Sequence, residues 1–314
     1  MSIAASLLIA MAIELALGWP RKLHARIGHP VTWLGHLIEC MDGWCNRDAD
    51  SDLIRKIAGA ATALVIIALA AAAGSLVTHV LPDGIFAPVL IAIAAWPLMA
   101  ARSLYDHVAD VAAPLGASDL PAARQAVAQI VGRDPELLDE AGVARAALES
   151  LAENTSDGVV APIFWGLLLG LPGLAAYKAI NTLDSMIGHR TPRHQMFGWA
   201  AARIDDVANL VPARLTGLLF ALVSGRAKSA FTCMLQDAGH HRSKNAGWPE
   251  AAMAGGLDIR LSGPRAYGGQ GMSHEPWLND GARDATPADL ARGLNLYVCA
   301  MLLLVALLAV AAAI

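Results

Sequence analysis

Long apolar runs are separated by polar stretches along the 314 residues of this chain. Two runs, 57–80 and 295–314, contain no Asp, Glu, Lys or Arg and reach the roughly 20 residues that a helix needs to cross a bilayer. Four shorter runs carry at most one charged residue each and lie at 2–17, 85–101, 159–177 and 208–223. The pattern predicts six membrane segments within a single membrane domain, 1–314.

These runs show no alternation of period two, so helices are favoured over a β-barrel. Pro162, Gly170, Pro172 and Gly173 interrupt the run at 159–177, which favours a broken or re-entrant helix there. The predicted fold is therefore an all-α integral membrane protein, a multi-pass helical bundle in which some membrane helices are short or broken. The alternative is a large soluble helical protein, which the uninterrupted apolar run at the C-terminus disfavours.

The polar stretches predict the topology. Pro82-Asp83-Gly84 is a tight turn between two apolar runs, and Arg55, Lys56 and Arg102 flank this hairpin at its other end. The positive-inside rule then places residues 18–56 and 102–158 in the cytoplasm. The stretch 102–158 is a polar helical insert, and 224–294 is a polar loop rich in glycine, including Gly268-Gly269. In the insert, Asp134 as N-cap and Pro135 as the first helical residue predict the start of a helix.

Four clusters of polar residues lie next to the shorter apolar runs. Two of them share an Asn-Thr-x-Asp step, in E-N-T-S-D-G at 153–158 and in I-N-T-L-D-S at 180–185. A third cluster is R-I-D-D-V-A-N at 203–209, and a fourth is H-H-R-S-K-N at 240–245. Burying such groups beside a membrane is costly unless they are paired, so several clusters of the same chemistry indicate a site rather than helix caps alone.

The residue types of these clusters leave two functional readings. Carboxylates and amides suit Mg²⁺, and neighbouring Arg and Lys side chains suit phosphate oxygens. One reading is therefore an enzyme that handles phosphate through Mg²⁺ at the membrane face, and the other is a transporter whose broken helices bind a polar solute. The four cysteines lack metal-ligand spacing, and the net charge of −4 argues against a nucleic-acid partner.

Several longer motifs resemble the membrane-bound adenosylcobinamide-phosphate synthases of cobalamin biosynthesis. They are E-S-L-A-E-N-T-S-D-G-V-V-A-P at 149–162, Y-K-A-I-N-T-L-D-S-M-I-G at 177–188 and F-G-W-A-A-A-R-I-D-D-V-A-N-L-V-P-A-R-L-T at 197–216. H-P-V-T-W-L-G at 29–35, I-V-G-R-D at 130–134 and N-A-G-W-P-E-A-A-M-A-G at 245–255 fit as well. One departure is Lys244, which stands where the family pattern usually has Pro.

The resemblance implies a ligase that joins (R)-1-amino-2-propanol, or its O-phosphate, through an amide to the propionate carboxyl of adenosylcobyric acid. ATP as co-substrate, Mg²⁺ and an acyl phosphate intermediate are expected, with no bound redox cofactor. The implied location is the cell inner membrane, with the active site on the cytoplasmic side. Expected partners are the corrinoid substrate, the aminopropanol compound, membrane lipid and later membrane enzymes of the cobalamin pathway.

Roles for individual residues follow as hypotheses under this resemblance. The expected Mg²⁺ ligands are Asp157, Asp184, Asp205 and Asp206, and the expected phosphate clamps are Arg145, Lys178, Arg203 and Arg214. Glu153 is the favoured base, with Glu149 as the alternative. Substrates would be oriented by Asn154, Asn181 and Asn209, and covered by His241, Ser243 and Asn245.

The reading requires Asp157 and Asp184 to face one cavity that opens to the cytoplasm, which a re-entrant turn at Pro172-Gly173 would allow. An intramembrane prenyltransferase also uses Asn/Asp motifs with Mg²⁺, but its acidic motifs are longer than a single N-T-x-D step. A transporter, or a scaffold for neighbouring pathway enzymes, is the non-enzymatic alternative.

Overall fold

The computed structural model describes residues 2–82, 84–132, 134–189, 191–267, 271–273 and 275–314. Asp83 of the predicted turn, Arg133 of the I-V-G-R-D motif and Gly268-Gly269 of the glycine-rich loop lie outside the described residues. The chain divides into two compact units. The first consists of Met1–Ala100, Ala161–Asn209 and Leu308–Ile314, and the second of Ala101–Val160 and Leu210–Leu307.

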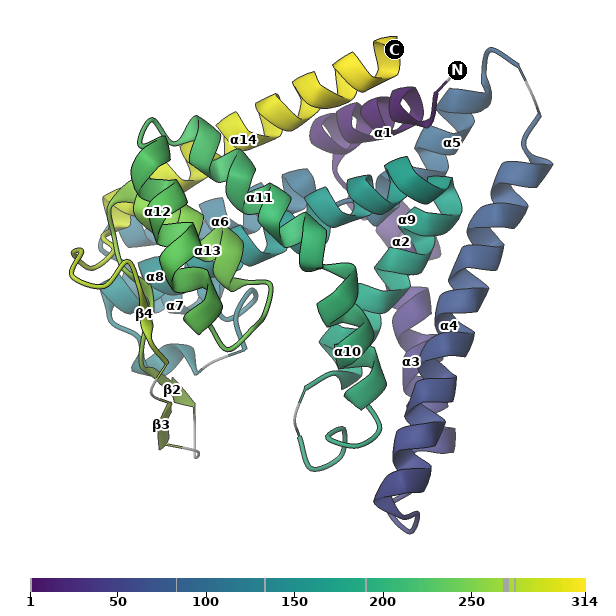
Figure 1. Cartoon of the computed structure of the whole chain (residues 1–314), viewed down its shortest axis with the longest axis horizontal. Coiled ribbons are helices and arrows are strands. Elements are labelled where there is room, and N and C mark those ends of the chain that lie inside the picture. The colour runs from purple at the N-terminus through teal and green to yellow at the C-terminus, as the bar shows by residue number, and fades with distance from the viewer. Residues whose placement is uncertain (1, 83, 133, 190, 268–270, 274) are drawn as a thin grey trace. The chain divides into compact units, whose positions relative to one another are not determined.

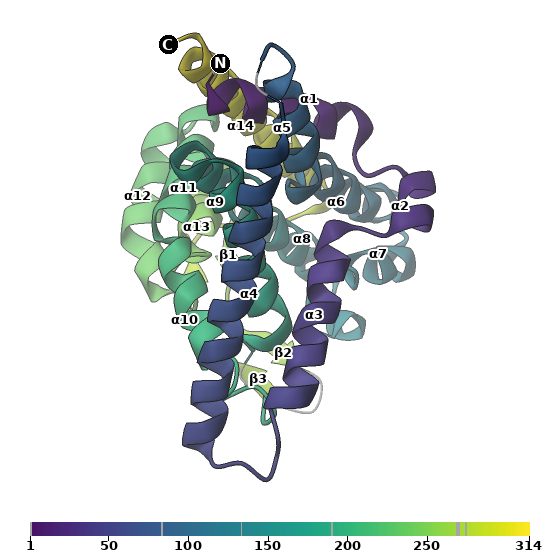
Figure 2. The same ribbon diagram turned by 90° about the vertical axis from the view of Figure 1, so that its right-hand side faces the viewer.

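The helices of the first unit come from the N-terminal third and from the middle of the chain. They are α1 (Ile3–Leu17), α2 (Arg21–Ile27), α3 (Pro30–Cys45), α4 (Asp52–Val80), α5 (Ala87–Ala95), the 3-10 helix η1 (Trp96–Leu98), α9 (Ala161–Ile187) and α10 (Trp199–Ala208). Figure 2 shows α3 and α4 running side by side as an antiparallel pair. The N-terminus of α4 is capped by Ser51, whose hydroxyl accepts a hydrogen bond from the backbone N–H of Ile54.

The core of the first unit lies where α3, α4, α9 and α10 meet (Figure 1). Its buried residues are small or aliphatic, apart from one phenylalanine: Ile38, Ala63, Ile66, Ala179, Leu183, Ile187, Phe197 and Ala201. Because Leu183 and Ile187 are the inward residues of the last turns of α9, the polar residues between them are turned away from this core. The packing therefore determines which face of α9 carries Asp184.

Glycine permits two close backbone approaches in this unit. A Cβ atom added to Gly59 would stand 1.8 Å from the carbonyl oxygen of Phe197, so α4 lies directly against the segment that precedes α10. A Cβ on Gly198 would stand 1.6 Å from the carbonyl oxygen of Ile187. The chain therefore leaves the end of α9 and returns to the same point just before α10.

We expect Gly59→Ala to destabilise the first unit by about 1–3 kcal/mol, because the new methyl group must displace a backbone carbonyl in a packed core. Thermal and denaturant unfolding of the detergent-solubilised protein would measure this loss. Gly43→Ala is the matched control, since Gly43 lies inside α3 with nothing within 4 Å of the added Cβ. The control should be neutral or slightly stabilising, and equal losses for both variants would contradict the close approach.

The motif E-N-T-S-D-G lies at a change of helix type. The α-helix α8 (Glu140–Thr155) passes into a π-helical turn, η3 (Ser156–Val160), before α9 begins. Single π-turns occur frequently at functional sites, because the extra residue re-aims the side chains around it. Further along α9 the helix is broken at Gly170 (φ 69°, ψ −160°), two residues before the predicted turn at Pro172-Gly173. Pro172, two residues later, has no N–H to donate to the preceding turn of the helix, which accounts for a break at this point.

The second unit contains the polar insert and the glycine-rich region. Its helices are α6 (Ala101–Gly116), α7 (Leu120–Val127), the 3-10 helix η2 (Pro135–Leu137), α8, η3, α11 (Leu210–Val223), α12 (Ala227–Asp237), the 3-10 helix η4 (Ala238–His240), α13 (Gly247–Leu257) and most of α14 (Pro287–Ala313). Two short antiparallel strand pairs join them: β1 (Leu261–Ser262) with β4 (Trp277–Leu278), and β2 (Arg265–Tyr267) with β3 (Gly271–Ser273).

Two expectations for this unit are corrected. The loop expected at 224–294 is largely regular, because it contains α12, α13 and the start of α14. The helix expected to start at Asp134 forms only a 3-10 turn there, and α8 begins at Glu140. Asp139 caps α8 by accepting a hydrogen bond from the N–H of Gly142 at 2.7 Å, so the second acidic cap determines where the long helix starts.

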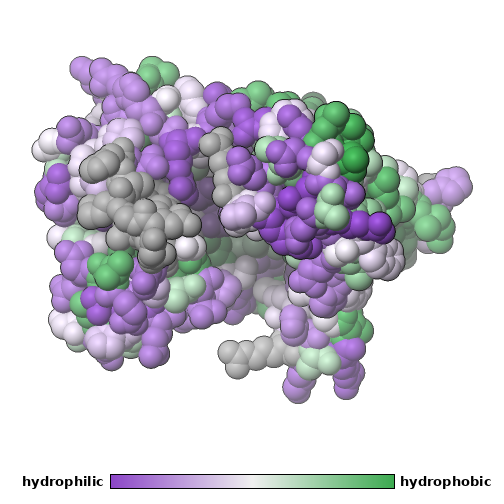
Figure 3. Space-filling model, turned by 90° about the horizontal axis from the view of Figure 1, so that it is seen from below, coloured by the Kyte–Doolittle hydropathy of each residue, from purple (hydrophilic) through white to green (hydrophobic). Residues whose placement is uncertain are grey.

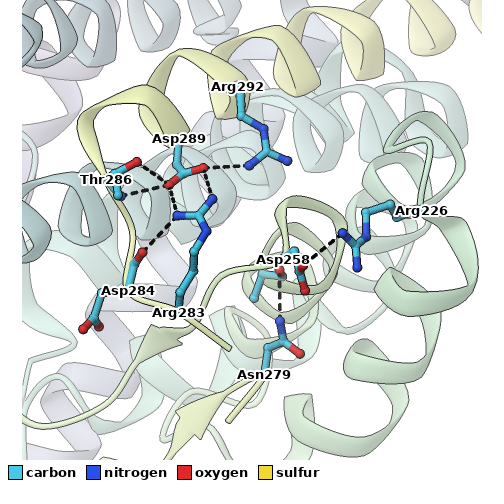
Figure 4. A network of polar contacts seen from close by, with 9 residues as sticks. Arg226, Asp258, Asn279, Arg283, Asp284, Thr286, Asp289 and Arg292 are labelled. Carbon is cyan, nitrogen blue, oxygen red and sulfur yellow. Dashed lines mark hydrogen bonds and ion pairs between the residues drawn. The ribbon is translucent and has the colours of Figure 1, made fainter. Parts of the chain in front are cut away.

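The first turn of α14 is held by a buried carboxylate (Figure 4). Asp289 accepts hydrogen bonds from the N–H and the hydroxyl of Thr286, at 2.9 and 2.6 Å. Guanidinium groups of Arg283 and Arg292 also donate to it, each at 2.7 Å. Thr286, Pro287 and Asp289 match the arrangement of a capping residue, a proline at the first helical position and an acidic third residue.

Among the described residues, four helical stretches are long and apolar enough to cross a membrane: Asp52–Val80, Ala87–Gly116, Glu140–Ile187 and Pro287–Ala313. Two bent helix pairs raise that number to six if each counts as one span, and one of them joins α10 to α11 at 47°. The predicted class, an all-helical multi-pass membrane protein with some broken helices, is confirmed. Hydrophilic side chains cover most of the face seen in Figure 3, and hydrophobic ones show at its right-hand margin.

Candidate functional site

Two predicted clusters come together in the first unit. Asp184 lies on the last turns of α9, and Arg203 and Asp206 lie on α10, which packs against α9 (Figure 1). Arg203 and Asp206 form an ion pair, with Nη1 2.8 Å from Oδ2. Asp184 interacts electrostatically with both of them and with His189. Carboxylates from two different helices therefore interact electrostatically with each other and with one guanidinium group.

Gly188 makes room for the Asp184 carboxylate. A Cβ atom on Gly188 would lie 2.0 Å from Oδ1 of Asp184, so this carboxylate folds back over the end of α9. Any larger residue at 188 would push the carboxylate out of its place. The spacing D-S-M-I-G, four residues from Asp to Gly, thus has a direct geometric meaning that the sequence motif alone did not reveal.

Asp205 has different surroundings from its neighbour Asp206. Its Oδ1 accepts a hydrogen bond from Nδ2 of Asn209 at 3.1 Å, and Oδ1 of Asn209 accepts one from the hydroxyl of Tyr177 at 2.9 Å. Asn209 and Tyr177 are buried, and Trp165 donates from its indole N–H to the carbonyl of Ala208. Asp205 and Asn209 therefore help to hold α10 against α9, while Asp206 interacts electrostatically with Asp184. Sequence reasoning did not identify Tyr177 or Trp165 as part of this arrangement.

Few of the described side chains in the first unit are placed where they could hold a metal ion together. Within the described part of the chain, no group of three or more His, Cys, Asp and Glu side chains is placed to hold a metal ion. Mg²⁺, however, is commonly bound through one or two carboxylates together with water and substrate phosphates. The pair Asp184 and Asp206 offers two carboxylates for such a site, and the roles of all four predicted metal ligands stay predictions.

Two other predicted residues of the first unit precede Asp184 on α9. Asn181 lies one turn before Asp184, and its carbonyl accepts a hydrogen bond from the hydroxyl of Ser185. Lys178 lies nearer the start of α9 and lines an apolar crevice. Its predicted role as a phosphate clamp is not tested by this placement.

In the second unit, α8 carries Arg145, Glu149, Glu153 and Asn154. Glu149 is buried, and its Oε1 accepts a hydrogen bond from the N–H of Ser262 at 2.7 Å. This contact joins α8 to β1, at the start of the glycine-rich hairpin. Arg145 lies 4.0 Å from the same carboxylate, and its guanidinium carbon lies 5.0 Å from the ring centre of Trp277. Glu149 is thus engaged in holding the hairpin, which leaves Glu153 as the better candidate for a base.

Glu153 and Asn154 are exposed, whereas Asp157 is half-buried within the π-turn. The side-chain amide of Asn154 donates to the carbonyl of Ser150 at 2.9 Å and to its hydroxyl oxygen at 3.2 Å. The predicted base Glu153 therefore lies one turn before a helix irregularity, on an accessible face. Whether Asp157 and Asp184 share a cavity stays a prediction.

The fourth cluster forms a compact polar turn before α13. Nδ1 of buried His241 accepts a hydrogen bond from the N–H of Ser243 at 3.1 Å, and its Nε2 lies 3.6 Å from a carboxylate oxygen of buried Glu250. The hydroxyl oxygen of Ser243 accepts hydrogen bonds from the N–H groups of Asn245 and Ala246. His241, Ser243 and Asn245 therefore shape the start of α13. Sequence reasoning missed Glu250, although it stands within the quoted motif N-A-G-W-P-E.

The remaining predicted clamp, Arg214, lies on α11 in the same unit. Its guanidinium carbon stands 4.3 Å from the ring centre of Trp248, and Nη1 donates to the carbonyl of Leu210. A stacked arginine is held in a fixed orientation, which suits recognition of a planar or anionic group as well as packing.

We expect Cys233 to resist alkylation in the folded protein. Burial, reinforced by the carboxylate of Asp237 3.4 Å from the sulfur, raises the pKa of Cys233 to about 12. At pH 8 its thiolate fraction should then be about a thousandfold below that of an ordinary cysteine. Iodoacetamide labelling followed by peptide mass spectrometry measures the rate. Because the pKa is raised by folding, the associated stability should be present below the ordinary thiol pKa and be lost as the pH rises toward 12.

The control for Cys233 is Asp237→Asn, which removes a negative charge while the thiol stays buried. This variant should label faster than the native protein but slower than the unfolded chain. Equal labelling rates in the folded and unfolded states would contradict the assigned surroundings of Cys233.

Comparison with known proteins gives a consistent result along the whole chain. The family model described as CobD/Cbib protein matches residues 7–297. "Cobalamin biosynthesis protein CobD" of Rhodobacter capsulatus is 58% identical over 96% of this chain and 95% of its own length. The proteins of the same name from Sinorhizobium fredii and Brucella suis are 47% and 45% identical, over 90% and 95% of this chain and 88% and 94% of their own. No solved structure matches.

Proposed function

This chain belongs to the CobD/CbiB family of cobalamin biosynthesis proteins, and we propose that it joins (R)-1-amino-2-propanol, or its O-phosphate, to a propionate carboxyl of adenosylcobyric acid. The product of this amide ligase is adenosylcobinamide or its phosphate. The observation that carries the proposal is the electrostatic interaction of two carboxylates, Asp184 on α9 and Asp206 on α10, with each other and with Arg203. Such a group suits a reaction in which phosphate is transferred.

The chemistry requires an activated carboxyl, because a carboxylate is a poor acyl donor at neutral pH. Attack of a carboxylate oxygen on the γ-phosphorus of ATP forms the acyl phosphate and releases ADP. The amine nitrogen then attacks the acyl carbon, the bond from carbon to the phosphate oxygen breaks, and inorganic phosphate leaves. A base takes the proton that the amine loses, which must be removed before or during attack.

Residues of the first unit would serve the phosphate step. Asp184 and Asp206 would hold Mg²⁺, which when bound supplies positive charge to the phosphoryl oxygens. Arg203 lies beside both carboxylates, where its fixed guanidinium fork can contact an oxygen of the transferred group. Gly188 keeps the Asp184 carboxylate in place, since any side chain there would collide with it.

Residues of the second unit would serve the amine and the corrinoid. Glu153 is the proposed base because it is exposed on α8, whereas Glu149 is buried and bonded to the hairpin. Asp157, in the π-turn, is proposed as a ligand to Mg²⁺. The pair His241 and Glu250 would position the turn before α13 rather than touch the reacting atoms. ATP chemistry requires the site to open to the cytoplasm, on the inner face of the cell membrane.

The direct test uses the full-length protein purified in detergent. It is incubated with adenosylcobyric acid, ATP, MgCl₂ and either aminopropanol or its O-phosphate, in parallel reactions. Chromatography with mass spectrometry should show the amide product together with one equivalent of ADP and of phosphate. Folded protein that yields neither amide nor ADP with either amine would overturn the proposal, and the faster of the two reactions identifies the preferred amine.

A further inference from the structure

An apolar crevice of about 330 Å³ lies among the membrane helices of the first unit. Its walls come from four places: the start of α3, the second half of α4, the end of α5 with η1, and α9 just after its break. On α9, Leu171, Ala175 and Lys178 line it at a spacing of four and three residues, so they share one helix face. Small residues on α4, Ala70 and Ala73, keep the crevice open, while Gly74 lets the backbone of α9 approach α4 at its edge.

The crevice has one basic end. Lys178 is the only charged residue among the thirteen described residues that line it. It is the last of the three lining residues on α9, after Leu171 and Ala175. His29, directly before the lining residues Pro30 and Val31, lies within electrostatic range of Lys178. The remaining walls are apolar, which excludes a large polar ligand such as a corrinoid or a nucleotide, because its polar groups would be buried without partners.

Tryptophans surround the same end of the crevice. Trp33 lines it and donates from its indole N–H to the carbonyl of Ile27 at 2.8 Å. Trp19 contacts both the His29 ring, at 4.8 Å, and the Trp96 ring, at 5.3 Å, while Trp96 donates to the carbonyl of Gly18. Tryptophan is the residue that gathers at the level of lipid headgroups. The basic end of the crevice thus has the surroundings expected where phospholipid phosphates lie.

We propose that this crevice is a binding site for an anionic phospholipid. One acyl chain would lie between α3, α4 and α9. The phosphate would lie next to Lys178, at the end of the crevice where Trp19, Trp33 and Trp96 are found. The complementarity has two parts, since apolar walls match a hydrocarbon chain and the cation matches a negative headgroup. Neither part alone would select a phospholipid over a detergent or over free phosphate.

The test measures lipid binding rather than catalysis. Native mass spectrometry of the detergent-solubilised full chain, titrated with phosphatidylglycerol or phosphatidylcholine, gives the affinity for each lipid. We expect phosphatidylglycerol to bind at least about tenfold more tightly than phosphatidylcholine. Ala73→Phe, which fills the crevice from α4, should reduce phosphatidylglycerol binding about tenfold, and Ala175→Leu, which fills it from α9, should act in the same direction.

Two further variants separate the chain from the headgroup. Ala72→Phe is the matched control, because Ala72 is an exposed neighbour on α4 that does not line the crevice, and it should bind lipid as the native protein does. Lys178→Gln leaves the volume of the crevice nearly unchanged and should abolish the preference between the two lipids. Circular dichroism and thermal unfolding verify that each variant is folded.

Three results would overturn the proposal. They are equal binding of the two lipids to the native protein, equal effects of Ala72→Phe and Ala73→Phe, and complete displacement of phosphatidylglycerol by an equal concentration of glycerol 3-phosphate. The last result would mean that only the phosphate is recognised and that the apolar crevice is not used. All three readouts are independent of amide formation, so failure here leaves the proposed ligase activity untouched.

Discussion

Asp184→Asn is expected to abolish amide formation while the protein stays folded in the membrane. The substitution keeps the size of the side chain that fits over Gly188 but removes one of the two interacting negative charges. A carboxylate contact to Mg²⁺ in a phosphoryl-transfer site contributes several kcal/mol to the transition state, which corresponds to about 10²–10³-fold in rate or more. The rate of ADP and amide formation, measured with purified protein, provides the result.

Two comparisons show whether the loss arises from the metal. Ser185→Ala, one residue further on the exposed side of α9, should retain activity because Ser185 makes only a hydrogen bond to its own helix. Asp206→Asn should raise the Mg²⁺ concentration needed for half-maximal activity. Near-native turnover by Asp184→Asn would remove this residue from the metal site, and an unchanged Mg²⁺ dependence in Asp206→Asn would do the same for the second carboxylate.

Asp289→Asn is expected to cost about 3–5 kcal/mol of stability, the largest loss that we predict. The buried carboxylate accepts hydrogen bonds from two guanidinium groups and from both polar groups of Thr286 (Figure 4). A neutral amide has one acceptor oxygen, so several donors lose their partner and two positive charges lose their counterion. Thermal unfolding and denaturant titration in detergent would measure the loss.

Asp258→Asn is the matched control in the same region. Asp258 is exposed and pairs with Arg226 at 3.0 Å, so its loss should cost less than about 1 kcal/mol. Its backbone is left-handed, with φ 60°, a conformation that asparagine adopts readily. If both variants unfolded at the same point, the buried network at the start of α14 would not be a main source of stability.

Much of the fold could be predicted from the apolar pattern, because a helix must be long and nearly uncharged to cross a bilayer and the chain contains such runs. The start of α14, eight residues before the apolar run at 295–314, is also marked in the sequence, since Thr286, Pro287 and Asp289 form a helix-start signal. The start of α8 was not, because Asp134 and Asp139 are both good caps and only tertiary packing selects the second. The break at Gly170 rather than at Pro172-Gly173 likewise depends on a left-handed conformation that glycine permits but does not require.

The sequence predicted which residues belong to the candidate site, but not which of them contact one another. The pattern indicated Asp184, Asp205 and Asp206 together, yet it could not show that Asp205 accepts a hydrogen bond from Asn209 while Asp206 interacts electrostatically with Asp184. Neighbouring residues on a helix point about 100° apart, so two adjacent carboxylates seldom share one role. Glu149 shows the same limit, because its partner is a backbone N–H more than a hundred residues away. Residues without an obvious polar signal, such as Gly188, are found only through the space around them.

The meeting of Ile187 with Gly198 closes the segment between them into a loop, and Arg193 fastens this loop to two neighbouring helices. The carbonyl of Arg193 accepts hydrogen bonds from the side chains of Asn46, which follows α3, and of Arg55 on α4, and its guanidinium group pairs with Asp42 on α3. Closure entropy grows only with the logarithm of loop length, so the entropic cost of an added residue here would be small. Its main cost would instead come from displacing the contacts of Arg193, which tie the approach of α10 to α9 to the positions of α3 and α4.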